Sequence, residues 1–305
     1  MEKVLKIGDV TWFHTSNPSK KEIEEIKNKY DLHEIVEDDI SEINTQDKID
    51  IYDESMFLVL HFPKFNNKTK THFSNEFNII LWKNFIISIT WYETNHIDKI
   101  RKEYFDDLKS GNEKFKVSPY YLLYVMIDVM YDKVLLALNK FKKDLHDIES
   151  WIFQGRKMNQ SFIEKLLIKR RNGIVLKHIM LPQQDILEEL NKVTLEKYSG
   201  ELDVYFEDLQ YKQDKIMSNI DIENENIQTL SDTYNSLMSI KTNSMISILT
   251  IVTAIFWIMT FLTGLYGMNV LLPWQTLSYM FLVIIFMMFF IWIAMLLFFK
   301  KKWWL

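Results

Sequence analysis

The chain has 305 residues, a net charge of −5 and no cysteine, which excludes disulfides, thiolate metal sites and a cysteine nucleophile. Its basic residues are spread along the sequence, so no nucleic-acid partner is expected. Only seven glycines and five prolines occur, which favours long helices over a loop-rich fold. The N-terminal residues 1–9 are mixed polar and lack the apolar core of a signal peptide.

Residues 1–115 predict a mixed α/β subdomain, a small sheet with helices on its faces. Strands are expected at Val4–Thr15, Ile49–Tyr52, Met56–Phe65, Glu76–Trp82 and Phe85–Trp91, and helices at Lys20–Tyr30, Leu32–Ile40 and Ile97–Leu108. The dipeptide Lys83-Asn84 has the length of a tight turn and predicts a hairpin between the last two strands.

Helical periodicity takes over at Pro119. Tyr120–Phe153 predicts one helix, and Gln160–Val193 predicts a second that is kinked or broken at Pro182. A third helical pattern starts near Glu201 and reaches Lys241 without glycine or proline. If it is helical from 201 to 265, the helix is about 98 Å long at 1.5 Å per residue. Nine carboxylates and three lysines between residues 201 and 241 would draw cations to this stalk.

The stalk helix needs partners, because a helix of that length is not stable alone. Its apolar stripe predicts packing against copies of itself or against the preceding helices. The stripe consists of Val204, Leu209, Ile216, Ile220, Ile227, Leu230 and Leu237.

The last fifth of the chain is uncharged over 58 consecutive residues, from Thr242 to Phe299. A bilayer-spanning helix needs about 20 apolar residues, and the run contains two such lengths, 245–265 and 278–299, around a turn with Pro273. Helices satisfy their own backbone hydrogen bonds in lipid, so two transmembrane helices are predicted. A buried hydrophobic hairpin in a soluble protein is the alternative, which the length of the run disfavours.

Lysines flank the spans on one side only, with Lys241 before the first and 300–302 after the second, while residues 266–277 between them carry no charge. Lys and Arg mark the cytoplasmic side, so both termini are expected in the cytoplasm. Trp303 and Trp304 fit an interfacial anchor. The predicted domains are a cytoplasmic domain 1–240, made of the subdomain 1–115, a helical hairpin 116–200 and the stalk helix 201–240, and a transmembrane domain 241–305.

The sequence Tyr266-Gly267-Met268-Asn269 at the end of the first span resembles the signature of the CorA family of divalent-cation (magnesium) transport proteins of the two-transmembrane GMN type. Further similarities lie in Lys241-Thr242-Asn243, in the tail Lys300–Leu305, in Leu32–Ile40, where Glu34 replaces a proline, and in Tyr205–Asp208. The resemblance covers nearly the whole chain. It implies an α+β cytosolic domain on a long stalk helix, two C-terminal transmembrane helices and a funnel-shaped homopentamer whose first spans line one pore.

The resemblance also implies a function, namely passive, potential-driven influx of Mg²⁺ through the cell (inner) membrane, gated by cytosolic Mg²⁺. The protein would then be no enzyme and would need no organic cofactor. Transport of Co²⁺, Ni²⁺ or Zn²⁺ is the alternative within the family. A membrane-tethered receptor or enzyme is disfavoured, because the sequence has no phosphate-binding glycine loop, no serine-hydrolase elbow and no zinc-ligand pattern. The seven histidines are scattered and fit packing or surface roles.

Three sets of site residues follow from the resemblance. The selectivity filter would be Gly267, Met268 and Asn269, with Met268 packing to fix the turn. The pore and gate would be Asp232, Asn243, Ile246, Leu249, Thr253, Trp257, Thr260 and Gly264, which from residue 243 recur every three or four positions on one helical face. A regulatory metal ion between subunits would be held by Asp39 and Asp208, or by Asp38 if the alignment shifts by one residue.

Two departures from the family pattern concern the pore. Trp257-Ile258 stands where the family commonly has Met-Pro, so a proline kink is absent and an indole occupies a narrow position. The outer loop 270–275 carries no carboxylate. Selection there would have to rely on dipoles rather than on Coulomb capture, which leaves the transported ion and the rate open.

Overall fold

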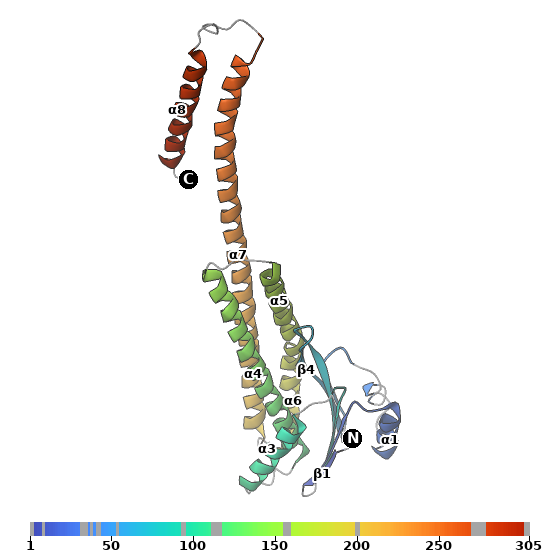
Figure 1. The fold of residues 1–305 in the computed structure, drawn as a ribbon. Helices are drawn as coiled ribbons and strands as arrows, with labels where there is room; N and C mark the ends of the chain where they lie inside the picture. The colour runs from blue at the N-terminus through green and yellow to red at the C-terminus, as the bar shows by residue number, and fades with distance from the viewer. Residues whose placement is uncertain are drawn as a thin grey trace. The chain divides into compact units, whose positions relative to one another are not determined.

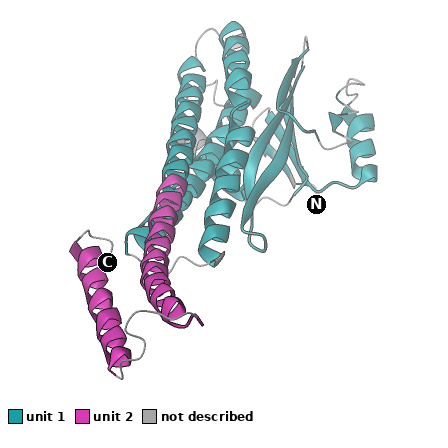
Figure 2. Ribbon diagram, turned by 90° about the horizontal axis from the view of Figure 1, so that it is seen from above, with its two compact units in different colours: residues 1–230 teal, residues 231–305 magenta. Residues whose placement is uncertain are grey.

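The computed structural model describes residues 3–7, 10–30, 36, 39–40, 44–52, 55–92, 96–110, 118–154, 160–198, 202–269 and 279–301 (Figure 1). The chain divides into two compact units, Met1–Leu230 and Ser231–Leu305 (Figure 2). The elements are β1 (Lys3–Ile7), β2 (Val10–Ser16), α1 (Lys20–Tyr30), β3 (Lys48–Ile51), β4 (Ser55–Asn66), β5 (Thr71–Trp82), β6 (Phe85–Thr90), α3 (Ile97–Ser110), α4 (Pro119–Phe153), α5 (Gln160–Met180), α6 (Gln183–Tyr198), α7 (Asp203–Tyr266) and α8 (Met280–Lys301).

The first unit contains a six-stranded sheet of order β1-β2-β6-β5-β4-β3, in which β2 and β6 run parallel and the other pairs antiparallel. The predicted hairpin is confirmed, since Trp82 pairs with Phe85 across Lys83-Asn84. The prediction of one strand over 4–15 is wrong. Ile7 pairs with Val10, so two antiparallel strands, β1 and β2, take the place of the single predicted strand.

Helices cover both faces of the sheet, as predicted (Figure 1). On one face, Trp12 and Leu58 of the sheet share a buried core with residues of the long helices such as Tyr131. On the other face, Ile23 and Ile26 of α1 pack with strand residues that include Phe57, Val59 and Ile87. Burial on both faces explains why β4 is apolar over the continuous run 56–60 rather than at alternate positions.

Local signals explain where the long helices begin and end. The hydroxyl of Ser118 accepts the Tyr121 N–H at 3.1 Å as an N-cap of α4, and Pro119 follows at the first helical position. The predicted break at Pro182 is confirmed, because α5 ends at Met180 and α6 begins at Gln183. Proline has no N–H to donate and clashes with the preceding turn.

Helix α7 is continuous through both units, and its apolar stripe finds partners within its own chain. Leu209, Ile216 and Ile220 are buried in the main core of the first unit. Two predicted members of the stripe do not belong to it, since Val204 is 71 % and Leu237 37 % exposed. Val204 lies one residue from the start of α7, before its packing begins, and Leu237 lies beyond the first unit.

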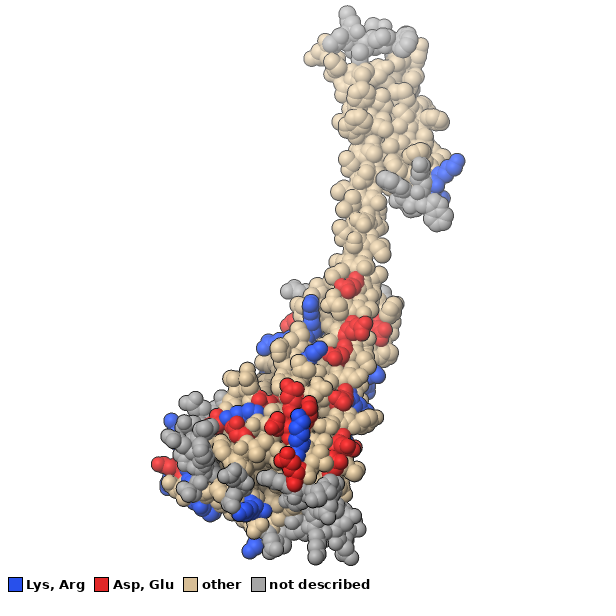
Figure 3. Space-filling model, turned by 180° about the vertical axis from the view of Figure 1, so that it is seen from behind, with Lys and Arg blue, Asp and Glu red and all other residues tan. Residues whose placement is uncertain are grey.

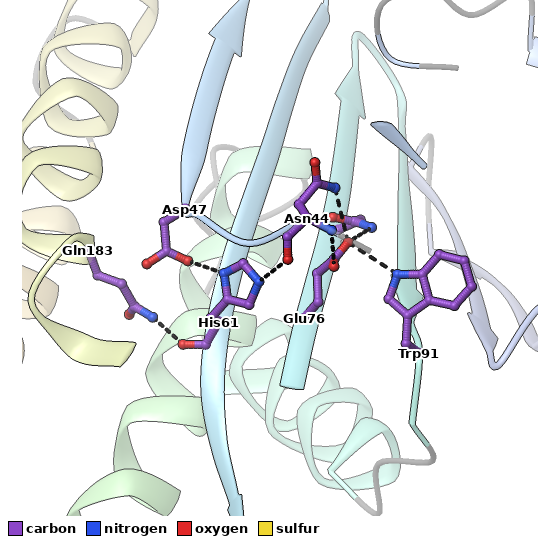
Figure 4. A network of polar contacts seen from close by, with 7 residues as sticks. Asn44, Asp47, His61, Glu76, Trp91 and Gln183 are labelled. Atoms are coloured by element: carbon purple, nitrogen blue, oxygen red, sulfur yellow. Dashed lines mark hydrogen bonds and ion pairs between the residues drawn. The ribbon is translucent and has the colours of Figure 1, made fainter. Parts of the chain in front are cut away.

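A buried polar network ties the segment before β3 to the sheet and to α6 (Figure 4). The His61 Nδ1 lies 2.7 Å from Asp47 Oδ1, and its Nε2 lies 3.0 Å from the Asn44 carbonyl oxygen. Glu76, only 2 % exposed, accepts from the Asn44 N–H at 2.7 Å and from Trp91 Nε1 at 3.1 Å. The side chain of Gln183, the first residue of α6, donates to the His61 carbonyl. Each buried charge therefore has polar partners, as burial requires.

Several predicted features lie outside the described residues: most of the helix expected at 32–40 with Asp38, the outer loop 270–278 with Pro273, and the tail 302–305. One backbone contact of the helix expected at 32–40 is described. The Ile40 N–H donates to the Val36 carbonyl at 3.0 Å, and a bond over four residues is the spacing of a helical turn.

Candidate ion pathway and regulatory residues

Two helices of the structure, α7 and α8, are long and apolar enough to cross a membrane. On the face shown in Figure 3 the two spans carry no acidic or basic side chain before the end of α8, where Lys300 and Lys301 lie. The threonine hydroxyls of the first span are satisfied by its own backbone; Thr253 and Thr260 each donate to the carbonyl four residues earlier at 2.8 Å. Such bonds let hydroxyls sit in an apolar helix.

One face of the first span packs toward α8. A groove of about 580 Å³ lies between the two helices and is apolar throughout. Its α7 side includes Ile251 and Ile255, which are the only buried hydrophobic residues among the described spans. The α8 side includes Met288 and Trp292. This contact fixes which way the first span is turned relative to its neighbour.

The predicted pore residues of the span lie on the opposite face. None of them lines the groove toward α8. In the single chain Ile246 is 55 %, Leu249 66 % and Trp257 71 % exposed, and a methyl group built on Gly264 would touch nothing within 4 Å. Thr253 and Thr260 are exposed on the same side. The structure thus brings six predicted residues together along one stripe, which is uncharged and lies outside the groove toward α8.

The remaining two predicted pore residues precede the span. Asn243 and Asp232 are exposed on α7. Asp232 is the last carboxylate before the uncharged run, and it lies in the second unit, as does the whole predicted stripe. A cation that moved along this face of α7 would therefore meet a carboxylate, then an amide, then apolar side chains.

Helix α7 ends at the predicted selectivity residues. The Gly267 N–H donates to the Thr263 carbonyl at 2.9 Å, and the Met268 N–H to the Leu265 carbonyl at 3.4 Å. A Cβ on Gly267 would come within 3.0 Å of the Thr263 oxygen, so glycine permits a close approach here rather than a left-handed turn. Asn269 is exposed, and Met268 is 53 % exposed in the single chain.

Each predicted regulatory carboxylate lies beside a lysine of its own chain. Asp39 bonds to Lys48, which is also 3.1 Å from Asp50. Asp208 lies 4.0 Å from Lys212, one helical turn away. Asp39 and Asp208 share no ion-pair partner among the described residues. No group of three or more acidic or histidine residues that could hold a metal ion occurs in the described part of the chain.

Lys212 is surrounded by three carboxylates. It bonds to Asp128, and lies 3.4 Å from Asp132 and 4.0 Å from Asp208. Burial opposes the charge of Lys212, but the hydrogen bond and charge of Asp128 outweigh it and raise the pKa of the ammonium group. The sequence reasoning missed both lysines. The contact of Lys212 had a sequence signal, because Asp208 and Lys212 are oppositely charged and four residues apart on a helix. The contact of Lys48 had none, because Lys48 is nine residues from Asp39 and in another element.

The fold defines the class first, an α+β domain followed by a long helix and two C-terminal apolar helices of membrane-spanning length. The profile of the family described as "CorA-like Mg2+ transporter protein" matches residues 8–301, and the chain belongs to this family. It is a divalent-cation transporter, since the family is one of ion transporters and not of enzymes.

The names of relatives in the family mention different metal ions. "Cobalt/magnesium transport protein CorA" of Thermotoga maritima is 24% identical over 273 residues, 88% of this chain and 76% of the relative. "Zinc transport protein ZntB" of Yersinia pseudotuberculosis is 22% identical over 273 residues, 88% of this chain and 80% of the relative. The complete structure of the CorA magnesium transporter from Methanocaldococcus jannaschii matches with a TM-score of 0.83 at 21% identity, over 97% of this chain and 92% of that one.

Proposed function

We propose that five copies of this chain form a Mg²⁺ channel of the GMN type in the cell (inner) membrane, with both termini in the cytoplasm. The observation that carries the proposal is the exposed, uncharged stripe of α7, which faces away from α8 and ends at Asn269. Copies of α7 with this stripe turned to a common axis would enclose a path without charge. The family resemblance supplies the number five.

The chemistry of the stripe favours a hydrated Mg²⁺. Mg²⁺ prefers oxygen ligands and dehydrates reluctantly, so it passes most readily where oxygen atoms bind its water shell. Thr253 and Thr260 keep free lone pairs after their hydroxyls donate to the backbone, and Asn243 and Asn269 add side-chain carbonyls. The membrane potential would supply about 4.6 kcal/mol per 100 mV for a double charge, enough for passive influx.

Selection would take place at the outer end. A ring of Asn269 carbonyl groups, one from each copy, would accept hydrogen bonds from the water shell of the ion. The close approach that Gly267 permits would hold the chain end near the axis. Below this ring, Ile246 and Leu249 would form an apolar constriction that closes by dewetting.

Gating would depend on cytosolic Mg²⁺ between neighbouring copies. Asp39 of one copy and Asp208 of the next repel each other unless a cation lies between them, so bound Mg²⁺ would stabilise the closed assembly. Lys48 and Lys212 lie beside these carboxylates and would compete with the ion. The site would therefore respond only to relatively high Mg²⁺ concentrations.

Co²⁺, Ni²⁺ or Zn²⁺ is the second candidate, since a zinc transport protein is among the relatives. These ions bind nitrogen and sulfur ligands more strongly than Mg²⁺ does. The chain has no cysteine, and the predicted stripe has no histidine. Its oxygen-only chemistry therefore supports Mg²⁺ as the physiological ion.

The test is ion uptake by purified protein in liposomes with Mg²⁺, Co²⁺, Ni²⁺ or Zn²⁺ outside and a potassium diffusion potential of either sign. We expect Mg²⁺ uptake that increases with an inside-negative potential and needs no pH gradient. Uptake of Zn²⁺ without Mg²⁺, or uptake that follows a proton gradient and ignores the potential, would assign the chain to the other candidate.

A further inference from the structure

The first unit contains a basic cavity far along the chain from the predicted pathway. A cavity of about 410 Å³ lies between the β4–β5 hairpin, α4 and α5. Four of its lining residues are lysines: Lys70, Lys140, Lys165 and Lys169. Its lining carboxylates are only two, Asp144 and Asp147, so the lining has a formal excess of two positive charges. We call this cavity the basic pocket.

Aromatic rings line the basic pocket beside the lysines. Lys140 Nζ lies 5.7 Å from the ring centre of Phe65, and Lys165 Nζ lies 5.3 Å from that of Trp151. These distances are typical of cation–π contacts, which hold ammonium groups against aromatic faces. One cavity therefore presents both positive charge and flat apolar surface to a ligand.

A neighbouring side chain reports the positive potential independently. His72 stacks at a tilt on Phe65 with ring centres 5.0 Å apart. Burial, and next the charges of Lys169 and Lys140, lower the pKa of His72 to about 4. The charges of two pocket lysines thus act on His72 and disfavour a further positive charge at this wall of the pocket. The same positive charges favour an anion.

The walls of the basic pocket are fixed by buried contacts. Asn172, fully buried on α5, accepts the His72 N–H at 2.9 Å and donates to the Lys70 carbonyl at 2.9 Å. It thereby holds the tip of the β4–β5 hairpin against α5. Lys169 of α5 bonds to Asp144 of α4 and joins the other two walls. A preformed site of this kind costs little ordering free energy when a ligand binds.

The cavity continues past the indole. A second cavity of about 420 Å³ shares Asp147, Trp151 and Lys165 with the basic pocket and adds the polar residues Ser150 and Gln154. The combined cleft has a basic end, an aromatic middle and an uncharged polar end. A compact inorganic anion would use only the first of these parts, whereas an elongated anion with a flat ring uses all three.

We propose that the basic pocket binds a nucleoside polyphosphate, with its phosphates among the four lysines and its base against Trp151. The volume lies in the range of about 300–1,000 Å³ that is usual for small-molecule sites. Lysine ammonium groups bind phosphate oxygens through charge-assisted hydrogen bonds, and bases stack on aromatic side chains. This inference goes beyond the proposed ion channel and does not rest on it.

The test measures equilibrium binding of labelled ATP to the purified full-length protein in detergent, with EDTA present. We expect saturable binding that Lys140→Gln with Lys165→Gln weakens by about tenfold or more, because two charge-assisted contacts are lost. The matched control, Lys21→Gln with Lys192→Gln, removes the same charge from exposed positions and leaves the affinity unchanged. Trp151→Leu should weaken ATP binding several-fold. The same substitution should leave the affinity for inorganic tripolyphosphate, measured by competition with labelled ATP, unchanged.

Absence of saturable ATP binding would overturn the proposal, as would an equal loss in the control pair. Tripolyphosphate that binds as tightly as ATP, together with no effect of Trp151→Leu on ATP, would overturn the nucleotide class. Unfolding temperatures of all variants show whether a loss of binding reflects a loss of folding. The assay contains no divalent cation and measures no flux, so its failure is distinguishable from a failure of the channel proposal.

Discussion

At the level of single residues, the response of this chain to cations depends on its carboxylates and on the lysines beside them. The family resemblance pointed to Asp39 and Asp208, and sequence reasoning could not foresee that Lys48 and Lys212 lie against them. Lys48 is the first residue of β3 and meets Asp39 through a tertiary contact that has no local sequence signal. Regulation by a divalent ion must therefore be considered as a competition between the ion and an ammonium group.

Removing the ammonium group should strengthen the response to Mg²⁺. We expect Lys48→Gln to lower, by several-fold, the Mg²⁺ concentration that half-protects the protein from limited proteolysis, since Asp39 then loses its competing partner. Asp208→Asn with Asp39→Asn should abolish the protection. Lys21→Gln, at an exposed lysine of α1, is the control and should behave as wild type. A half-protecting concentration that Lys48→Gln leaves unchanged would place the sensor elsewhere.

The buried ring of His61 should make the stability of the folded protein depend on pH. Both ring nitrogens face accepting oxygens, of Asp47 and of the Asn44 carbonyl, an arrangement that favours protonation of both nitrogens. Burial opposes this charge, but the hydrogen bond and charge of Asp47 outweigh it and raise the pKa of His61 above the ordinary 6.5. The stabilisation is fully present below pH 6.5 and is lost as the pH rises through the raised pKa.

His61→Gln should therefore unfold at a lower temperature than wild type at pH 6, because breaking a buried pair costs about 3–5 kcal/mol. The difference between the two proteins should shrink as the pH rises from 6 toward 9, when wild type loses its own charge. The measurement is thermal unfolding of the full-length protein in detergent. His146→Gln, at an exposed ring, should follow wild type at every pH. A His61→Gln difference that is independent of pH would show that the ring is neutral in the folded protein.

At the scale of elements, the sequence predicted the helices better than the strands. Helix α7 was expected from 201 to 265 and spans Asp203–Tyr266, because its apolar stripe has helical spacing and no glycine or proline interrupts it before the uncharged run. The separation of β1 from β2 was overlooked, because apolar residues continue through both segments and predict one strand. Which face of α7 meets α8 could not be derived, since both faces are apolar.

The face of α7 that points away from α8 should decide whether the closed channel is tight. We expect Leu249→Ser to raise ion leak through the closed assembly in liposomes with high internal Mg²⁺, because a polar residue hinders dewetting of the constriction. Leu297→Ser is the matched control, since Leu297 is 63 % exposed on α8 and takes no part in the stripe. Equal leak in wild type and Leu249→Ser would mean that another face of α7 lines the pathway.

At the level of the whole molecule, a single chain provides only one side of the proposed ion pathway. The stripe from Ile246 to Gly264 has no covering partner in the described chain, and such a large apolar face is stable only against lipid or other copies. We expect native mass spectrometry of the detergent-solubilised protein to give a homopentamer. A monomer that transports ions in liposomes would contradict the shared pore, whereas another ring size would correct only the number taken from the resemblance.

The central claim is that Mg²⁺ passes a ring of Asn269 side chains at the outer end of α7. The most direct measurement is potential-driven Mg²⁺ uptake into liposomes by Asn269→Ala. The control, Asn219→Ala, makes the same substitution at a half-buried site of α7 whose amide donates to the Lys215 carbonyl of the same helix. The account predicts that Asn269→Ala assembles like wild type but loses Mg²⁺ uptake, and that Asn219→Ala keeps it. Uptake by Asn269→Ala at the wild-type rate would contradict the account.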